Sequence, residues 1–369
     1  MSTARKNIFI IFFIFSATCV YAQDDYRVYH KLINNAERCY FLDNRNDSAY
    51  KYYDLAFSKF DFVFAKDCFM AAQIAFYSKN ERYISYLKKG FKNGLRPQHL
   101  KYSKILMPLL RDSIAFNRKF GDYKELRKIY LKRINVSALK TVINHVSQDQ
   151  SEKNMAYSAN IYENTYEYNK KLQRHISVIE SLIDRVGFPG DKIIGIDQAD
   201  IMKELGQDSS DYMDLYNLIY KDPKYNTGRM QFAACDDCIS QEKLFPLLLH
   251  HVCIYQLLHT KWEGLVISGQ IHPRDVALLF DNTLRLYDDP ADATNCKRIS
   301  EIWGCDYVRP PGCYKSYVFV DYKKLNCDRR TTDSMRSALF INPLVVDSAK
   351  KAFADIHGFD VSFGPMYCR

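Results

Sequence analysis

The stretch "NDSAYKYYDLAF" (46–57) is followed 34 residues later by "NERYISYLKKGF" (80–91), and the two copies carry similar residues at matching positions. Each copy opens on an Asn, closes on a Phe and places aromatic or apolar residues at helical spacing. A period of 34 is typical of units made of two helices, which bury their apolar stripes only against neighbouring units. The sequence therefore predicts stacked helical hairpins from about residue 24 to residue 134.

A third stretch, "FGDYKELRKIYLKR" (120–133), looks like the start of the second helix of another unit, at an offset nearer 40. Together these stretches resemble degenerate tetratricopeptide-like repeats over about 110 residues, although the Trp typical of that family is missing. We assign residues 23–136 to this region. The resemblance implies a short solenoid whose extended surface binds a protein or peptide partner.

The N-terminus, "MSTARKNIFIIFFIFSATCVYAQDD", predicts a signal peptide that is cleaved after Ala22. Its apolar run is far shorter than the roughly 20 residues of a membrane-spanning helix, so we expect no transmembrane segment after cleavage. Removing residues 1–22 lowers the formal charge from +9 to +7, because Arg5 and Lys6 are lost. We expect an exported, periplasmic or extracellular protein. The positive excess is modest, and the sequence contains no block of basic residues of the kind typical of nucleic-acid binding.

Ten of the eleven cysteines follow residue 22, and an even number in an oxidising compartment favours disulfides. Cys39 and Cys68 lie in the first helices of the first two repeat copies, so a bond between them could join repeat to repeat. Two buried free thiols are the alternative. The other candidates crowd the C-terminal part: Cys235, Cys238, Cys253, Cys296, Cys305, Cys313, Cys327 and Cys368.

The middle of the chain, 137–287, is predicted to be a helical domain. No Gly or Pro occurs from 122 to 186, which favours two or three long helices that end at Gly187, with Pro189 beyond. The next stretch, "KIIGID" (192–197), is predicted to be extended and buried, and "QADIMKELG" (198–206) is predicted to form a short helix. A further helix should start near Ser240, with Pro246 kinking it or lying in its first turn.

Three stretches in this region resemble a bacterial family described only as a domain of unknown function. They are Asp149–Gln150 within a helix, "LIDRVGFPGDKIIG" (182–195), and "LFPLLLHHV" (244–252) followed by "GQIHPRDVALLFDN" (269–282). The resemblance covers roughly 138–287 and implies no established activity. The Tyr-Gly-Thr-Gln-like ending common in that family is not recognisable, and "IWGCDYVRPPGC" (302–313) stands in its place.

Residues 288–369 are predicted to form a Cys-rich extension of irregular structure. One run, "YKSYVFVDY" (314–322), is strand-like, and a last helix is expected near 347–358. Few apolar residues recur there at helix or strand spacing, so the segment has little with which to form a hydrophobic core. We expect disulfides to stabilise it instead.

The polar residues of the long helices are the first candidates for chemistry. Asp149 and Gln150 could simply tie helices together, or Asp149 could orient a His, with His145 four residues earlier on the same helical face. His145 and His175 otherwise stand alone on their helical faces, where a His is more often packed or solvated than catalytic.

Cys235 and Cys238 form "CDDC", whose spacing suits a redox dithiol or half of a zinc site completed by His250 and Cys253. Structural disulfides are the preferred interpretation, because the two intervening acids disfavour a reactive thiolate. His250 and His251 are adjacent, so on a helix they point about 100° apart. One is expected in the core and the other at the surface. We expect no cofactor.

The stretch 269–282 groups His272, Arg274 and Asp275, which suggests either a catalytic cluster or a helix start. Pro273 suits the first residue of a helix, and Asp275 would then lie in the first turn, near the positive end of the helix dipole. His272 would occupy the cap position, where Ser, Thr, Asp or Asn is more usual. The helix start explains most of the cluster, so His272 is the one residue left as a candidate.

The sequence thus predicts a mainly α, exported, non-enzymatic binding or scaffolding protein that uses its helical repeats. The alternative is a hydrolytic enzyme of unrecognised type with a site in the C-terminal helical domain, and a purely structural envelope protein is a third possibility. Neither a Gly-x-Ser-x-Gly nor a His-Glu-x-x-His motif occurs in the chain.

Overall fold

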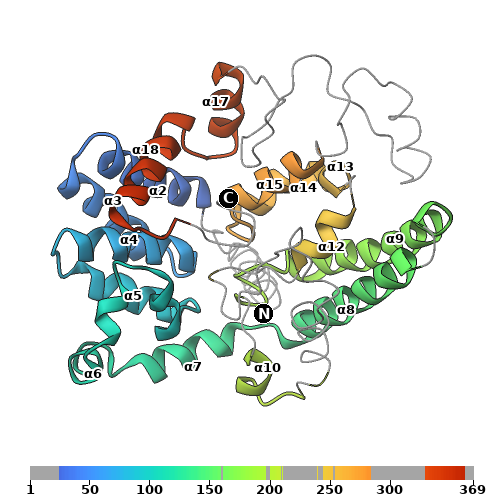
Figure 1. The fold of residues 1–369 in the computed structure, drawn as a ribbon, viewed down its shortest axis with the longest axis horizontal. Coiled ribbons are helices and arrows are strands. Elements are labelled where there is room, and N and C mark those ends of the chain that lie inside the picture. The colour runs from blue at the N-terminus through green and yellow to red at the C-terminus, as the bar shows by residue number, and fades with distance from the viewer. Residues whose placement is uncertain are drawn as a thin grey trace, which may run out of the picture.

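The computed structural model describes residues 25–158, 161–196, 200–208, 210, 239, 244–251, 254–283 and 329–361. Within these ranges all regular elements are helices, so the predicted mainly α class is confirmed. No helix of the described part is long and apolar enough to cross a membrane. Figure 1 shows short packed helices on one side of the molecule and a long hairpin of two helices on the other.

Two helical hairpins begin the chain. They are α2 (Tyr26–Phe41) with α3 (Asn46–Lys59), and α4 (Ala65–Tyr77) with α5 (Arg82–Lys92). The two sequence copies form α3 and α5, and the ring of Tyr86 lies 5.4 Å from that of Phe57. Almost every residue of α4 is buried. Most of them are apolar or small, and the buried polar residues Lys66, Asp67 and Gln73 have ion-pair or hydrogen-bond partners. This helix therefore lies at the centre of the N-terminal half.

The next elements lead from the hairpins to the long helices. They are two short 3-10 helices, η1 (Pro97–Tyr102) and η2 (Met107–Leu110), followed by α6 (Ser113–Phe120), α7 (Tyr123–Arg133), α8 (Val136–Ser158) and α9 (Ile161–Val186). The stretch without Gly or Pro thus forms long helices, as predicted. Gly187, at φ +92°, follows the last residue of α9 and confirms the predicted stop.

Residues 191–196 differ from the prediction, because they form turns rather than an extended segment. The amides of Ile193 and Ile194 donate to the Gly190 carbonyl at 3.0 Å, and that of Ile196 donates to the Tyr130 hydroxyl at 2.8 Å. These partners satisfy the backbone without a neighbouring strand. The side chains of Ile194 and Ile196 are buried, as expected, whereas that of Ile193 is only partly buried.

The remaining helices are short: α10 (Ile201–Glu204), α12 (Leu244–His250), α13 (Ile254–Leu257), α14 (His259–Ile267), α15 (Pro273–Thr283), α17 (Arg329–Ala338) and α18 (Leu344–His357). The single helix expected from near Ser240 is instead divided into α12 and α13. Pro246 lies in the first turn of α12, one of its two predicted places. The predicted last helix is confirmed as α18. The strand-like run 314–322 and the predicted signal peptide lie outside the described residues.

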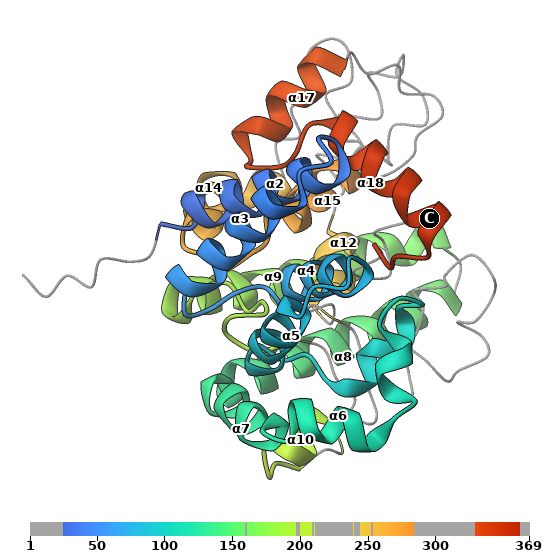
Figure 2. The ribbon, with the colours of Figure 1, turned by 90° about the vertical axis from the view of Figure 1, so that its left-hand side faces the viewer.

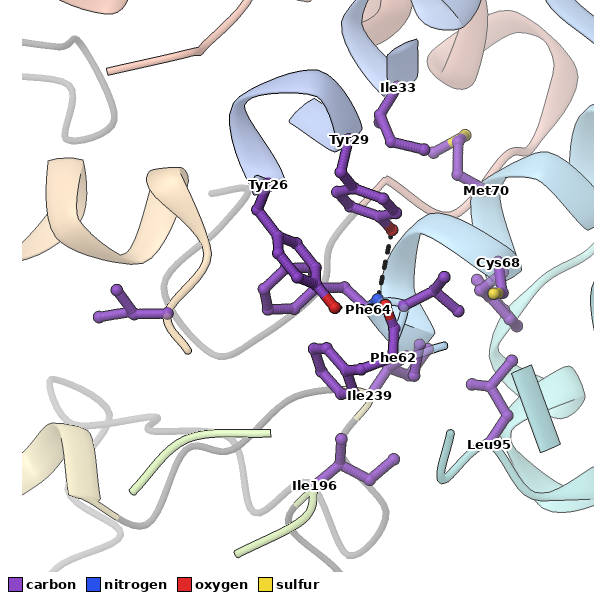
Figure 3. Packing of buried hydrophobic residues seen from close by; sticks show 14 of the residues in the cluster. Tyr26, Tyr29, Ile33, Phe62, Phe64, Cys68, Met70, Leu95, Ile196 and Ile239 are labelled. Carbon is purple, nitrogen blue, oxygen red and sulfur yellow. Dashed lines mark hydrogen bonds between the residues drawn. The ribbon is translucent and has the colours of Figure 1, made fainter. Parts of the chain in front are cut away.

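One buried hydrophobic cluster includes residues from Tyr26 to Phe359. Both α14 and α18 pack against α2, and Figure 2 shows α18 beside the N-terminal hairpin. The loop before α4 is fixed to α2 by two tyrosines: the Tyr26 hydroxyl donates to the Phe62 carbonyl at 2.8 Å, and the Phe64 amide donates to the Tyr29 hydroxyl at 3.3 Å (Figure 3). Residues from all three expected regions of the chain therefore share one core.

Candidate functional site

Three helices, α8, α9 and α12, meet along a seam that carries most of the polar candidates. On α8 the residues His145, Asp149 and Glu152 are spaced by four and three positions, which places them on one helical face. That face points at α9 and α12. We call these three residues, with Tyr168, His175 and His250, the seam cluster.

Asp149 is at the centre of the seam cluster and is fully buried. The Tyr168 hydroxyl donates to its Oδ1 at 2.8 Å, and the His250 Nδ1 lies 2.8 Å from its Oδ2. The Gln150 side-chain amide also donates to Oδ2, at 3.1 Å. A carboxylate removed from water is costly unless donors surround it, and these three supply them.

This arrangement sets the tautomer of His250. An imidazole whose Nδ1–H donates to a carboxylate carries its lone pair on Nε2, so Nε2 becomes its basic nitrogen. The Tyr168 oxygen lies 3.2 Å from the same Nδ1 and helps to fix the ring. The predicted role of Asp149 as a carboxylate that orients a His is thus geometrically possible, but its partner is His250 and not His145.

His145 contacts a different group. Its Nδ1 lies 2.9 Å from the Nδ1 of His175, whose Nε2 lies 3.2 Å from Glu152. Burial lowers the pKa of His145, and the neighbouring His175 lowers it further. The expectation that these two histidines stand alone was wrong, because α8 and α9 pack antiparallel and bring them together.

His251 points into the core, as expected for one of two adjacent histidines. It is buried, and burial lowers its pKa to about 4, so it is neutral near pH 7. The His250 side chain keeps 13% of its surface exposed. Of this pair, only His250 belongs to the seam cluster.

The stretch 269–282 lies elsewhere and starts a helix, as predicted. Gly269 turns the chain at φ +68°, and α15 begins at Pro273. His272 caps this helix, since its Nδ1 accepts the Arg274 amide at 3.2 Å. The last functional candidate of this stretch therefore has a structural role.

Asp275 lies in the first turn of α15, as predicted, and forms a buried ion pair with Lys66 of α4 at 3.2 Å. Burial above all, with the adjacent Lys66 cation, holds the pKa of His272 well below its usual range. Sequence reasoning missed Lys66, because it lies in another region of the chain and no local pattern marks it.

A small polar cavity lies beside His272, where α2, α4 and α15 meet. Its volume is about 20 Å³, room for about one water molecule, whereas small-molecule sites have roughly 300 Å³ or more. Burial lowers the pKa of His30 to about 4 and raises that of Asp67. The lining residues are His30, Ile33, Asn34, Glu37, Asp67, His272, Pro273, Arg274, Phe340 and Ile341.

Cys39 and Cys68 are buried free thiols, which is the alternative to the expected bridge between repeats. The other eight candidate cysteines, among them Cys235, Cys238 and Cys253 of the zinc alternative, lie outside the described residues. Among the residues that the structure describes, no group of three or more His, Cys, Asp or Glu side chains could hold a metal ion.

Tyr168 and Glu152 are the seam residues that the sequence did not single out. Glu152 could have been found from its helical spacing, three residues after Asp149. Tyr168 had no such signal, since the register between α8 and α9 determines its contact and a single sequence does not reveal that register. Comparison with known proteins gives no match for this chain, whether to a family model, a curated protein or a solved structure.

Proposed function

We propose that this protein is an acid–base enzyme of the hydrolytic type, with His250 as its general base. The observation that carries the proposal is the 2.8 Å contact between His250 Nδ1 and the fully buried Asp149, which also accepts from Tyr168. A buried carboxylate on Nδ1 orients the ring and stabilises the imidazolium that forms when Nε2 takes a proton. In this role, Nε2 removes a proton from a water molecule that attacks the substrate.

The packing of the first repeat helices favours this proposal over the binding function that the sequence suggested first. α2 is covered by α14 and α18, and all but two residues of α4 are buried. A solenoid offers a partner the concave surface of such helices. Here the chain's own helices α14 and α18 pack against α2, and the part of α2 that they cover is not open to a partner.

The test is a panel of chromogenic esters, amides, phosphodiesters and glycosides, assayed with the wild-type protein and with His250→Asn and Asp149→Asn. Losing a positioned general base lowers the rate by roughly 10²- to 10⁴-fold, so both variants should lose activity on that scale. The control is His259→Gln, at an exposed histidine of α14. Activity that survives in His250→Asn, or no hydrolysis of any substrate by the wild type, contradicts the proposal.

Protein binding by a tetratricopeptide-like N-terminal half is the second candidate. The pairing of α2 with α3 and of α4 with α5 supports it, as does Leu55 of α3, which is 50% exposed. If the N-terminal hairpins bind a partner through α3, Leu55→Asp abolishes capture of that partner from cell-envelope extract. Ile356→Asp, at an exposed residue of α18, leaves the capture unchanged. Equal capture by both variants rules out partner binding through this surface of α3.

We also propose that the protein is exported and that its C-terminal extension is linked by disulfides.

A further inference from the structure

The positive charge of this chain is concentrated in one short segment. Residues 101–133 contain ten Lys and Arg against three Asp and Glu, a net charge of +7, while the whole chain carries +9. This segment spans the end of η1, then η2, α6 and α7. Figures 1 and 2 both place α6 and α7 at the edge of the molecule.

Many of these cations form no ion pair with an acid of the described residues. Within the described part of the chain, six exposed side chains of the segment form no ion pair: Lys101, Lys104, Arg111, Arg118, Lys124 and Lys132. By contrast, the buried Arg127 pairs with Glu204 of α10, and Arg133 pairs with Asp61 at 2.9 Å. The inner cations therefore stabilise the fold, while the outer ones face solvent.

Apolar side chains project from the same segment. Ile114 is 80% exposed, and Arg118, four residues later, shares its face of α6. The exposed Arg111 lies just before this helix, at the end of η2. Phe116 and Phe120 point the other way, with Phe120 5.6 Å from the ring of Phe91. Three further exposed apolar residues belong to the segment: Tyr102, Met107 and Ile129.

We propose that the segment 101–133 is a docking surface for an anionic phospholipid bilayer. Clustered cations are attracted to anionic headgroups, and interspersed apolar side chains enter the boundary between headgroups and acyl chains. A folded acidic protein would instead need recessed pockets for its anchoring side chains. Ile114 projects outward, which favours the lipid. This surface is separate from the seam cluster and does not depend on the proposed enzymatic function.

Vesicle co-sedimentation tests the proposal, using the chain from Gln23 onward, which contains every described element. We expect binding to vesicles that contain phosphatidylglycerol, little binding to pure phosphatidylcholine, and loss of binding at high salt. Each cation near an anionic surface is worth about 1 kcal/mol, so the triple variant Arg111→Gln, Arg118→Gln, Lys124→Gln should bind roughly 100-fold more weakly. Ile114→Ser should weaken binding about tenfold.

The matched control removes three exposed cations from other helices, as Lys31→Gln, Lys51→Gln, Lys140→Gln. It changes the net charge equally and should keep wild-type binding, with circular dichroism spectra and melting temperatures verifying that both variants fold. Three results overturn the proposal: no preference of the wild type for phosphatidylglycerol, equal loss of binding in the control, or full competition by soluble polyglutamate. The last result would instead identify an acidic polypeptide partner.

Discussion

At Gly269 an added Cβ would lie 2.5 Å from the ring of Tyr26, and the backbone φ of +68° disfavours any L side chain. Gly269→Ala must therefore displace a fully buried tyrosine and strain the turn before α15. We expect a loss of about 2–4 kcal/mol in the free energy of unfolding, measured by urea titration.

Gly264→Ala is the matched control, because Gly264 lies inside α14 and its added Cβ would meet no described atom within 4 Å beyond the backbone of its own helix and its chain neighbours. Ala has a higher helix propensity, so this variant should be unchanged or more stable by up to about 1 kcal/mol. Equal destabilisation by Gly269→Ala and Gly264→Ala would contradict the close packing of Gly269 against the Tyr26 ring.

Buried histidines make the fold sensitive to acid. Burial lowers the pKa of both His30 and His251 to about 4, from 6.5 for an exposed His. Below pH 6.5 the unfolded chain binds protons that the folded chain does not, so stability is complete above that pH and is lost as pH falls towards 4. Each group contributes up to about 3 kcal/mol. The urea midpoint should fall between pH 7 and pH 5, and His30→Gln should reduce that fall. An unchanged midpoint contradicts the burial of these rings.

At the scale of elements, α18 is attached to α2 by a buried ion pair. Lys350 binds the carboxylate of Glu37, which also accepts from the Asn342 amide at 3.0 Å. Glu37→Gln removes the carboxylate that pairs with the buried Lys350, and breaking a buried ion pair costs roughly 3–5 kcal/mol. The exposed pair of Lys351 with Asp355 provides the control, since Asp355→Asn should cost less than about 1 kcal/mol. Chemical denaturation measures the free energy of unfolding of both variants. A similar decrease in the two would contradict the burial of the Glu37–Lys350 pair.

Element boundaries could be predicted from the sequence wherever the determining signal is local. Gly187 ends α9 and Pro273 begins α15, because capping depends on residues within one turn. The turns at 191–196 could not be predicted, since they depend on the Tyr130 hydroxyl, which lies 66 residues away. The candidate site was predicted in part, since Asp149 and His250 were both candidates. Their contact could not be predicted, because they are 101 positions apart in the sequence. The contact of Tyr168 with Asp149 could not be predicted either.

At the scale of the whole molecule, the C-terminal helices pack on the first hairpin, and the seam of α8, α9 and α12 holds the Asp149–His250 pair. Acid–base function requires that His250 carry its proton on Nδ1. Histidine-selective ¹⁵N NMR at neutral pH measures this directly and needs no substrate. We predict a protonated Nδ1 and an unprotonated Nε2 for His250, a state weakened in Asp149→Asn. A His250 ring that is protonated only on Nε2, or that is unaffected by Asp149→Asn, would contradict the proposed general base.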